Sequence, residues 1–284
     1  MNFTSRLVSA AAIAALLPAA NALAADYDPP IIMEDAVVDY APEVPVEIGT
    51  GWYLRGDIGY SFIQSEGTYS FRTYDPATSL YGGPYDYTTA GMKKPFSAGI
   101  GFGYRFTDYL RADATFDVFK SRFDGTSNIA EPCFNTLPGT GCRTEDTGDF
   151  LGVTMLANAY VDLGTYVGFT PYIGAGVGAT YVRWGDVTRQ NYCTGIACPG
   201  GFVDETTHEG SRDLRFTWAA MAGVAYDVSP NMKIDLGYRY RHISGGSMYE
   251  FDAFDRANGA TGDQGTDGGW TNHEVRVGLR YELW

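Results

Sequence analysis

The strongest constraint on the fold of this 284-residue chain is a side-chain alternation with a period of two residues. In residues 96–106, apolar side chains alternate with serine, glycine and arginine. In residues 273–283, Val275 and Val277 alternate with Glu274, Arg276 and other polar or small residues. Successive side chains of a strand point to opposite faces of its sheet. Each segment therefore predicts a strand with one apolar face and one small or charged face.

Eight segments share this pattern, and none shows a helical period: 52–62, 96–106, 110–118, 151–163, 173–181, 214–228, 232–240 and 273–283. Their connections alternate in length, with short ones at 107–109, 164–170 and 229–231 and long ones at 63–95, 121–150, 185–213 and 242–272. This layout is typical of outer-membrane barrels. It predicts an all-β fold: an eight-stranded antiparallel up-and-down transmembrane β-barrel with three short periplasmic turns and four long extracellular loops.

The N-terminal residues predict export. An apolar run over residues 7–17 follows a short basic start, and Ala22 and Ala24 form a small-x-small cleavage pattern. We expect residues 1–24 to be a signal peptide. The next stretch, from residue 26 to 50, has four prolines, seven acids and no basic residue. Such a composition cannot form a core, so residues 25–50 are predicted to be an acidic, Pro-rich periplasmic linker before a barrel of residues 51–284.

Composition narrows the class of protein further. The formal net charge is −14, from 20 basic and 34 acidic residues, whereas nucleic-acid binding needs a basic surface. No apolar run reaches the roughly 18 residues of a membrane-spanning helix. The glycine-rich sequences at 99–103 and 174–178 lack the spacing and strand–turn–helix context of a phosphate loop. We therefore expect no nucleic-acid partner and no cofactor.

Both ends of the predicted barrel carry a family resemblance. The opening GWYLRGDIGYSF (51–62), the closing VRVGLRYELW (275–284) and the acidic lead resemble the small outer-membrane β-barrel proteins of alphaproteobacteria. These are the opacity-type surface proteins and the rhizobial and Brucella outer-membrane antigens. The resemblance implies a Gram-negative outer-membrane location, contact with outer-membrane lipid and lipopolysaccharide, and insertion by the barrel-assembly machinery.

The strand faces opposite the apolar ones should point into the barrel. They carry nine basic and eight acidic side chains, a nearly balanced set that predicts a salt-bridge network in a filled interior. Glycines on facing strands, such as Gly103 and Gly174, would make room for large inward side chains. The predicted network comprises Arg55, Asp57, Arg105, Arg111, Asp113, Asp117, Asp162, Arg215, Asp227, Lys233, Asp235, Arg239, Arg241, Glu274, Arg276, Arg280 and Glu282.

Four cysteines lie in two of the long connections, Cys133 with Cys142 and Cys193 with Cys198. Proximity favours pairing within each connection, although four cysteines allow three connectivities. Disulfides are expected in an exported protein. A zinc site is the alternative, but the sequence lacks the short paired ligand spacings of structural zinc sites.

Two patterns suggest chemistry. His242 and Ser244 resemble the His-x-Ser of outer-membrane lipid A deacylases, in which serine attacks an acyl ester and histidine acts as base. Glu250 lies in a loop and Glu274 has the opposite parity, so neither is well placed to orient the histidine. We favour a strand-end histidine beside a turn. Separately, Asp252, Asp255, Asp263 and Asp267 are candidate ligands for a divalent cation, but their spacing matches no EF-hand, and a solvated loop is the favoured interpretation.

Aromatic residues complete the expectation for function. Trp52 and Trp218 suit interfacial girdles, whereas the sequence leaves Trp184 and Trp270 ambiguous. The first long connection carries Tyr69, Phe71, Tyr74, Tyr81, Tyr85 and Tyr87, a set suited to adhesive contacts. The expected function is therefore a non-enzymatic, structural surface barrel that supports envelope integrity and contacts host or surface ligands through its loops. A narrow porin and a lipid A deacylase-like enzyme are the alternatives.

Overall fold

The structure, a computed structural model, describes residues 51–133, 136–198 and 201–283. These residues fall within one compact unit, 47–284. The predicted signal peptide, 1–24, and the predicted linker, 25–50, lie outside the described residues.

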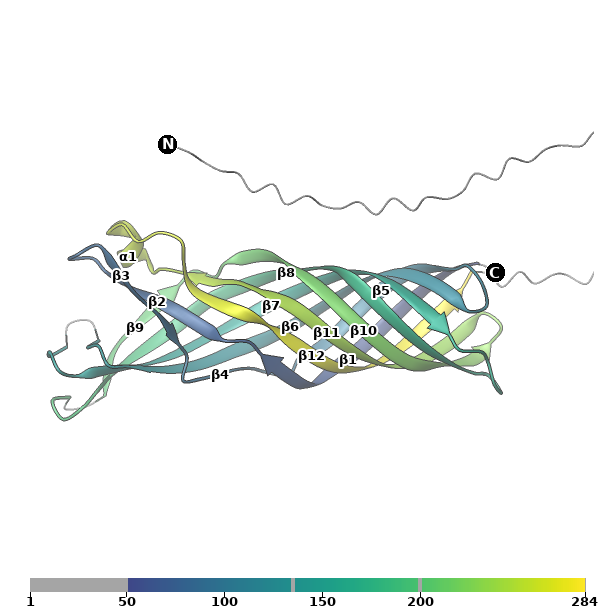
Figure 1. Cartoon of the computed structure of the whole chain (residues 1–284), viewed down its shortest axis with the longest axis horizontal. Coiled ribbons are helices and arrows are strands. Elements are labelled where there is room, and N and C mark those ends of the chain that lie inside the picture. Colours follow the sequence, from purple (N-terminus) through teal and green to yellow (C-terminus); the bar gives the residue numbers. More distant parts are fainter. Residues whose placement is uncertain (1–50, 134–135, 199–200, 284) are drawn as a thin grey trace, which may run out of the picture. The chain divides into compact units, whose positions relative to one another are not determined.

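One antiparallel sheet of twelve strands forms the fold (Figure 1). Its path runs β1-β5-β6-β7-β8-β10-β11-β12, and it closes into a barrel because β1 also pairs with β12. The strands are β1 (Gly51–Glu66), β2 (Tyr69–Asp75), β3 (Leu80–Asp86), β4 (Thr89–Met92), β5 (Phe96–Arg105), β6 (Leu110–Ile129), β7 (Gly141–Asp162), β8 (Phe169–Thr194), β9 (Phe202–His208), β10 (Arg212–Ser229), β11 (Met232–Glu250) and β12 (Asp263–Glu282).

The two ends of the barrel differ. One end, which we call the turn end, has the short connections 106–109, 163–168 and 230–231. The turn at 163–168 uses Gly164 and Gly168 at φ of 96° and 80°, backbone conformations that glycine adopts without steric cost. The other end, the rim, carries β2, β3, β9 and the short helix α1 (Ala253–Ala257). Among the described residues, no helix has the length and apolar character needed to cross a membrane.

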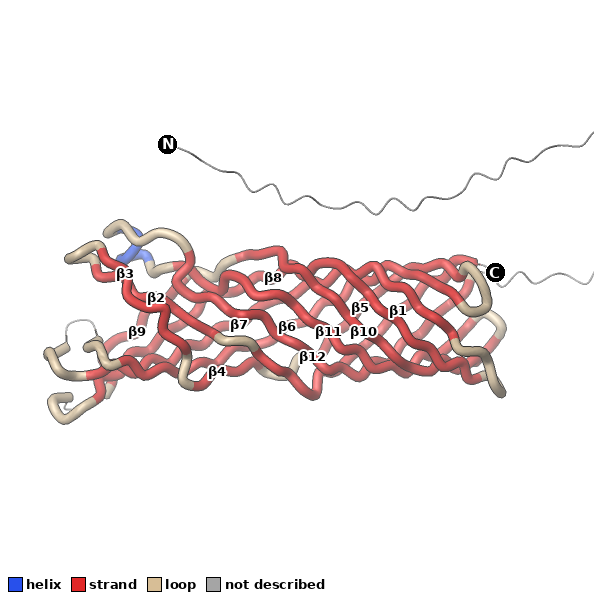
Figure 2. The backbone as a smooth tube through the Cα atoms, viewed as in Figure 1, coloured by secondary structure: helices blue, strands red, loops and turns tan. Residues whose placement is uncertain are grey.

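Strands extend much further toward the rim than the sequence predicts. The segments 121–150 and 185–213, expected to be long loops, are mostly paired strand, because β6 pairs with β7 as far as Ile129 opposite Cys142 (Figure 2). The first and last long connections also contain strand, in β2–β4 and in the ends of β11 and β12. Backbone pairing requires no apolar face, so it continues past the point where the apolar alternation stops.

The outward face of the barrel is apolar over its middle section. Ile58, Phe96 and Ile100 are 68%, 76% and 69% exposed, and their neighbours on the same face are also large and apolar. Isolated exposed apolar residues are ordinary, but a contiguous belt of this kind marks a surface that faces something other than water. The inward alternates, such as Asp57 and Asp117, are buried.

Candidate functional site

The interior nearest the turn end and the middle of the barrel is filled by ion pairs, which we call the ion network. At its centre, the Arg239 guanidinium lies 2.7 Å from Asp117 and 2.7 Å from Glu274. Arg276 donates to the other oxygen of Asp117 at 2.7 Å. All four side chains come from facing walls and are nearly inaccessible to solvent. Such buried charges persist only when they are paired and hydrogen-bonded.

The ion network continues toward the turn end. Arg55 binds Asp57 through both Nε and Nη2, each at 2.8 Å, and reaches Asp113 at 2.8 Å. Arg111 contacts Asp162 and stacks on the Tyr160 ring with its guanidinium carbon 4.1 Å from the centroid. The remaining pairs are Arg280–Asp235, Lys233–Asp227, Arg105–Glu282 and Arg215–Asp267.

Every side chain of the predicted interior set lies on the inward side of its strand, and each except Arg241 has an ion-pair partner among the described residues. The space between them is small. A cavity of about 20 Å³ lies among Arg55, Asn158, Tyr172 and their neighbours, room for about one water molecule.

Glycines make this filling possible. A Cβ on Gly103 would come within 2.4 Å of the Tyr53 ring, and one on Gly174 within 2.4 Å of the Tyr160 ring. Any other residue at these positions would force the tyrosines to move. The glycine-rich strands therefore accommodate large inward side chains, in agreement with the packing role predicted for them.

Toward the rim, the interior changes from charged to aromatic. We call this cluster the aromatic layer: Tyr69, Phe71, Met92, Phe119, Phe123, Phe150, Val182, Trp184, Val187, Ile243, Met248, Tyr249 and Trp270. Phe150 lies at its centre, with its ring centroid 4.7 Å from Trp184 and 5.5 Å from Trp270. The layer fills the barrel cross-section with packed apolar side chains.

The sequence contains a signal for this layer, which is a reversal of the inward–outward alternation along the strands. Along β6 the outward side is apolar up to Val118, but from Phe119 the apolar residue faces inward and Lys120 faces outward. The same reversal occurs on β8, where Val182 and Trp184 are buried and Arg183 is exposed. A change in the sign of the alternation therefore marks where the surroundings of the barrel change.

Two arginines join the ion network to the aromatic layer. The Arg241 guanidinium lies 4.6 Å from the Phe119 centroid, and Arg215 lies 5.3 Å from the centroid of Trp270. Within the described residues, Arg241 has no carboxylate within ion-pair distance, so its charge is stabilised mainly by this ring face and by polar neighbours such as Thr154.

A buried ion pair also lies beyond the layer, close to the rim. Arg189 contacts Asp146 at 2.6 Å and donates to the Tyr249 hydroxyl at 2.8 Å. Burial alone would raise the pKa of Asp146, but the Arg189 guanidinium prevails and holds that pKa below its ordinary value. The pair is therefore ionised and largely self-neutralising.

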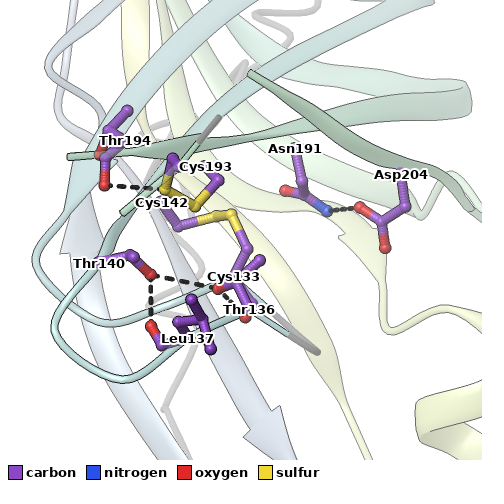
Figure 3. Close-up of a disulfide and its surroundings, with 10 residues drawn as sticks. Cys133, Thr136, Leu137, Thr140, Cys142, Asn191, Cys193, Thr194 and Asp204 are labelled. Carbon is purple, nitrogen blue, oxygen red and sulfur yellow. Dashed lines mark hydrogen bonds between the residues drawn. A yellow bond between two sulfur atoms is a disulfide. The ribbon is translucent and has the colours of Figure 1, made fainter. Parts of the chain in front are cut away.

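Two disulfides lie side by side at the rim (Figure 3). They join Cys133 to Cys142 and Cys193 to Cys198, the pairing within each connection that the sequence favours. Cys142 and Cys193 are not in loops, however. They lie in β7 and β8 and are directly opposite each other in the sheet register. All four sulfurs are committed to disulfides, so the alternative zinc site has no thiolate ligands.

In the structure, each of the residues proposed for acyl-ester chemistry has a different partner. His242 faces outward beside Trp218, with ring centroids 5.9 Å apart, and the Ser244 hydroxyl donates to the backbone oxygen of Phe216 at 2.9 Å. Glu250 accepts from Arg256, and Glu274 lies inside the barrel with Arg239. Neither acid is in contact with His242.

The four aspartates proposed as cation ligands are also dispersed among different partners. Asp267 pairs with Arg215, and Asp263 accepts from the Ser211 and Ser247 hydroxyls. Asp252 caps α1 by accepting from the backbone N–H of Asp255. In the part of the chain that the structure describes, no group of three or more His, Cys, Asp or Glu side chains is arranged to hold a metal ion.

Some aromatic residues of the first long connection are buried, whereas the sequence predicts that they are exposed at the surface. Tyr69 and Phe71 are buried in the aromatic layer, so they are not available for surface contacts, whereas Tyr85 and Tyr87 are partly buried and pack against the layer. Tyr74 and Tyr81 remain near the rim surface. Trp184 and Trp270, which the sequence leaves ambiguous, are each 2% exposed and belong to the layer. Trp52 and Trp218, predicted for an interfacial girdle, lie on the outward face and are 48% and 39% exposed.

Comparisons with known proteins agree with this architecture. An uncharacterized protein of Brucella suis is 36% identical over 269 residues, covering 89% of this chain and 91% of its own. Outer membrane protein PagN of Salmonella typhimurium is 27% identical, covering 73% and 84%, and opacity protein opA58 of Neisseria gonorrhoeae is 28% identical, covering 68% and 81%. The family model for the outer membrane protein beta-barrel domain matches residues 10–282. The chain therefore belongs to the outer-membrane β-barrel family.

Proposed function

We propose that this protein is a closed structural barrel of the outer membrane that presents its rim at the cell surface. Eight strands would cross the membrane: β1, β5, β6, β7, β8, β10, β11 and β12, with three periplasmic turns and four extracellular connections between them. The observation that carries the proposal is the combination of an apolar outward belt with an interior filled first by ion pairs and then by aromatic rings. Such a barrel stiffens the envelope and conducts no solutes.

Insertion follows from the same architecture. The barrel closes only when β12 pairs with β1, so an edge stays open until the last strand is in place. In lipid, an open edge leaves backbone groups without hydrogen bonds. We therefore propose that the barrel-assembly machinery inserts this chain after its export.

A row of basic residues supports lipopolysaccharide as the lipid partner. Lys120 is opposite Leu151, Leu151 is opposite Arg183, and Arg183 is opposite Arg212, so the three basic residues belong to one register row across four neighbouring strands. The three basic side chains are exposed and border the apolar belt on the rim side. Cations at this level match the phosphates of a lipid headgroup. We expect Lys120→Gln/Arg183→Gln/Arg212→Gln to bind less lipid A than wild type, with Arg143→Gln at the rim as control.

Contact with hosts or surfaces is assigned to the rim. The rim strands and α1 form extensions held by the two disulfides and by the aromatic layer beneath them. Rigid scaffolds that display variable segments are common binding surfaces. Binding of cells that display the barrel to immobilised matrix proteins, compared with a variant lacking β9, tests this part of the proposal.

Single-channel conductance is the decisive test of the closed barrel. The mature protein is refolded, its folding is checked by heat-dependent gel mobility, and it is inserted into a planar bilayer. We expect no steps, or only rare small ones. Frequent uniform steps would contradict the closed interior and favour the narrow porin. Recovery of the native protein in the osmotic-shock fluid instead of the outer-membrane fraction would contradict the location.

A further inference from the structure

An open cavity of about 780 Å³ lies at the rim, above the aromatic layer. Its walls include residues from the β2–β3 hairpin, from β7, β8 and β9, and from the segment around α1. Figure 1 shows β2, β3, β9 and α1 together at this end of the barrel. This size falls within the roughly 300–1,000 Å³ of small-molecule sites. The barrel thus has a cup at one end, although its interior below is filled.

The cup is lined by carboxylates with neutral partners. Glu131 accepts from the Tyr85 hydroxyl at 3.2 Å, and Asp204 accepts from the Asn191 amide at 2.7 Å. In the described ranges, no Lys or Arg nitrogen lies within 4.0 Å of any of these carboxylates. The ion network, by contrast, pairs its carboxylates with arginine. The five acids of the cup are Asp75, Glu131, Asp204, Asp252 and Asp255.

The basic groups of the cup do not offset this charge. Arg189 lines its floor, but its guanidinium is already paired with Asp146. His208 also lines the cup, and burial together with the Arg189 charge lowers its pKa to about 4, so it is neutral at pH 7. The cup therefore has an excess of negative charge.

Two buried acceptors in the wall are unused. Gln264 and Thr144 both line the cup, and each is only 4% exposed. Gln264 Oε1 and Thr144 Oγ1 have no hydrogen-bond partner among the described residues. A buried polar atom without a partner carries a free-energy cost, which a ligand with N–H donors would remove.

Aromatic rings supply the apolar part of the lining. Tyr74 and Tyr81 lie with their ring centroids 5.1 Å apart, and both contribute to the cup wall together with Phe254. Ring faces attract ammonium groups and also pack against methylene chains.

We propose that the cup binds an organic amine of the linear polyamine class. Its ammonium groups would pair with the separated carboxylates and donate to the unused acceptors, and its methylene segments would pack on the tyrosines. The carboxylates are spread around the wall and do not converge on one point, an arrangement that suits several linked charges better than one metal ion.

Calorimetric titration of the refolded mature barrel in detergent, free of lipopolysaccharide, tests the proposal with spermidine as the probe. We expect spermidine to bind, and triacetylated spermidine, in which all three amines are uncharged amides, not to bind. In Asp204→Asn/Asp255→Asn, affinity should fall by roughly twenty-five-fold, because a loss of about fivefold for each removed ion pair multiplies over the two pairs. The control Asp108→Asn/Asp186→Asn removes two exposed acids outside the cup and should leave affinity unchanged.

Three results would overturn the proposal. One is equal spermidine affinity in wild type and in the cup variant, which would indicate binding to the acidic surface in general. Another is binding of the acetylated probe with the same affinity. The third is no binding of spermidine, and binding of maltose in its place would identify a neutral carbohydrate site. Heat-dependent gel mobility confirms that each variant is folded.

Discussion

The two sections of the barrel interior are filled by side chains of opposite character, ion pairs in one and aromatic rings in the other. From the turn end to the middle of the barrel, the outward face is apolar and the inward face is charged, as far as Val118 and Asp117 on β6. From there toward the rim, the inward face is aromatic and the outward face is polar, starting at Phe119 and Lys120. One strand, β6, makes both arrangements. Side-chain polarity therefore follows the surroundings of each section, while the hydrogen-bonded backbone continues unchanged.

Removal of one central cation of the ion network should cause the largest loss of stability. Arg239→Met leaves Asp117 and Glu274 buried without their main partner, so we expect a loss of about 4 kcal/mol in the free energy of unfolding. Urea unfolding of the barrel in lipid vesicles measures it. The control Lys233→Met breaks a more accessible pair with Asp227 and should cost under about 1 kcal/mol. Similar costs for both variants would contradict the difference in burial.

The aromatic layer should be nearly as sensitive. Phe150→Ala removes the ring that contacts Trp184 and Trp270, and we expect a cost of about 3 kcal/mol from lost burial and the remaining void. The same urea experiment measures it, and Phe202→Ala, at an exposed rim position, serves as control. A cost below about 1 kcal/mol would show that the layer does not stabilise the barrel.

The disulfides should act on the rim alone. In Cys133→Ser/Cys142→Ser, we expect a loss of about 2 kcal/mol that is confined to opening of the β6–β7 end. Trypsin should then cleave at Arg143 while the barrel keeps its heat-dependent gel mobility. The variant Cys193→Ser/Cys198→Ser, whose disulfide closes a shorter loop, should show less cleavage at the same site. Unfolding of the entire barrel in either variant would contradict this separation of rim and barrel.

The smallest effect concerns titration at the rim. Burial and the nearby Asp252 raise the pKa of Asp255 to about 6, against the opposing effect of Arg189. Because this pKa is raised in the folded state, its contribution to stability is present at low pH and is lost as the pH rises through about 6. Carbon-13 NMR of the Asp255 carboxyl should show a midpoint near pH 6, and Asp252→Asn should lower it. A midpoint near 4 in wild type would contradict the prediction. His208, which also lines the cup and has a pKa of about 4, is neutral near pH 6.

Sequence periodicity was sufficient to predict the membrane-facing half of the fold. The outward positions from Leu54 to Ile58, and those from Val275 to Tyr281, have the predicted parity, and so do the inward arginines and aspartates. The sequence predicts which residues face inward and which face outward, because a shift of one residue would expose charged side chains to the apolar surroundings. The ion-pair partners could not be read, since they depend on which strands face each other across the barrel.

The rim half was harder to predict for a physical reason. Its strands turn polar residues outward, so segments such as 121–150 resemble solvated loops when outward apolar residues are taken as the sign of a strand. For the same reason, the sequence suggests that Tyr69 and Phe71 are exposed on a loop, although in the structure they fill the interior. The cup could not be predicted from the sequence either, because it combines side chains from β2, β9 and α1 that are far apart in the chain.

The pairing of β1 with β12 affects how the newly made chain folds. Tyr53 pairs with Glu282, so the seam joins residues from opposite ends of the described chain. Contacts of such large sequence separation form late and slowly, because the intervening chain must first be ordered. The strands that pair last therefore keep their apolar faces uncovered for the longest time, so we expect the yield of closed barrel to depend on how quickly β12 reaches β1 compared with how quickly the open chains aggregate.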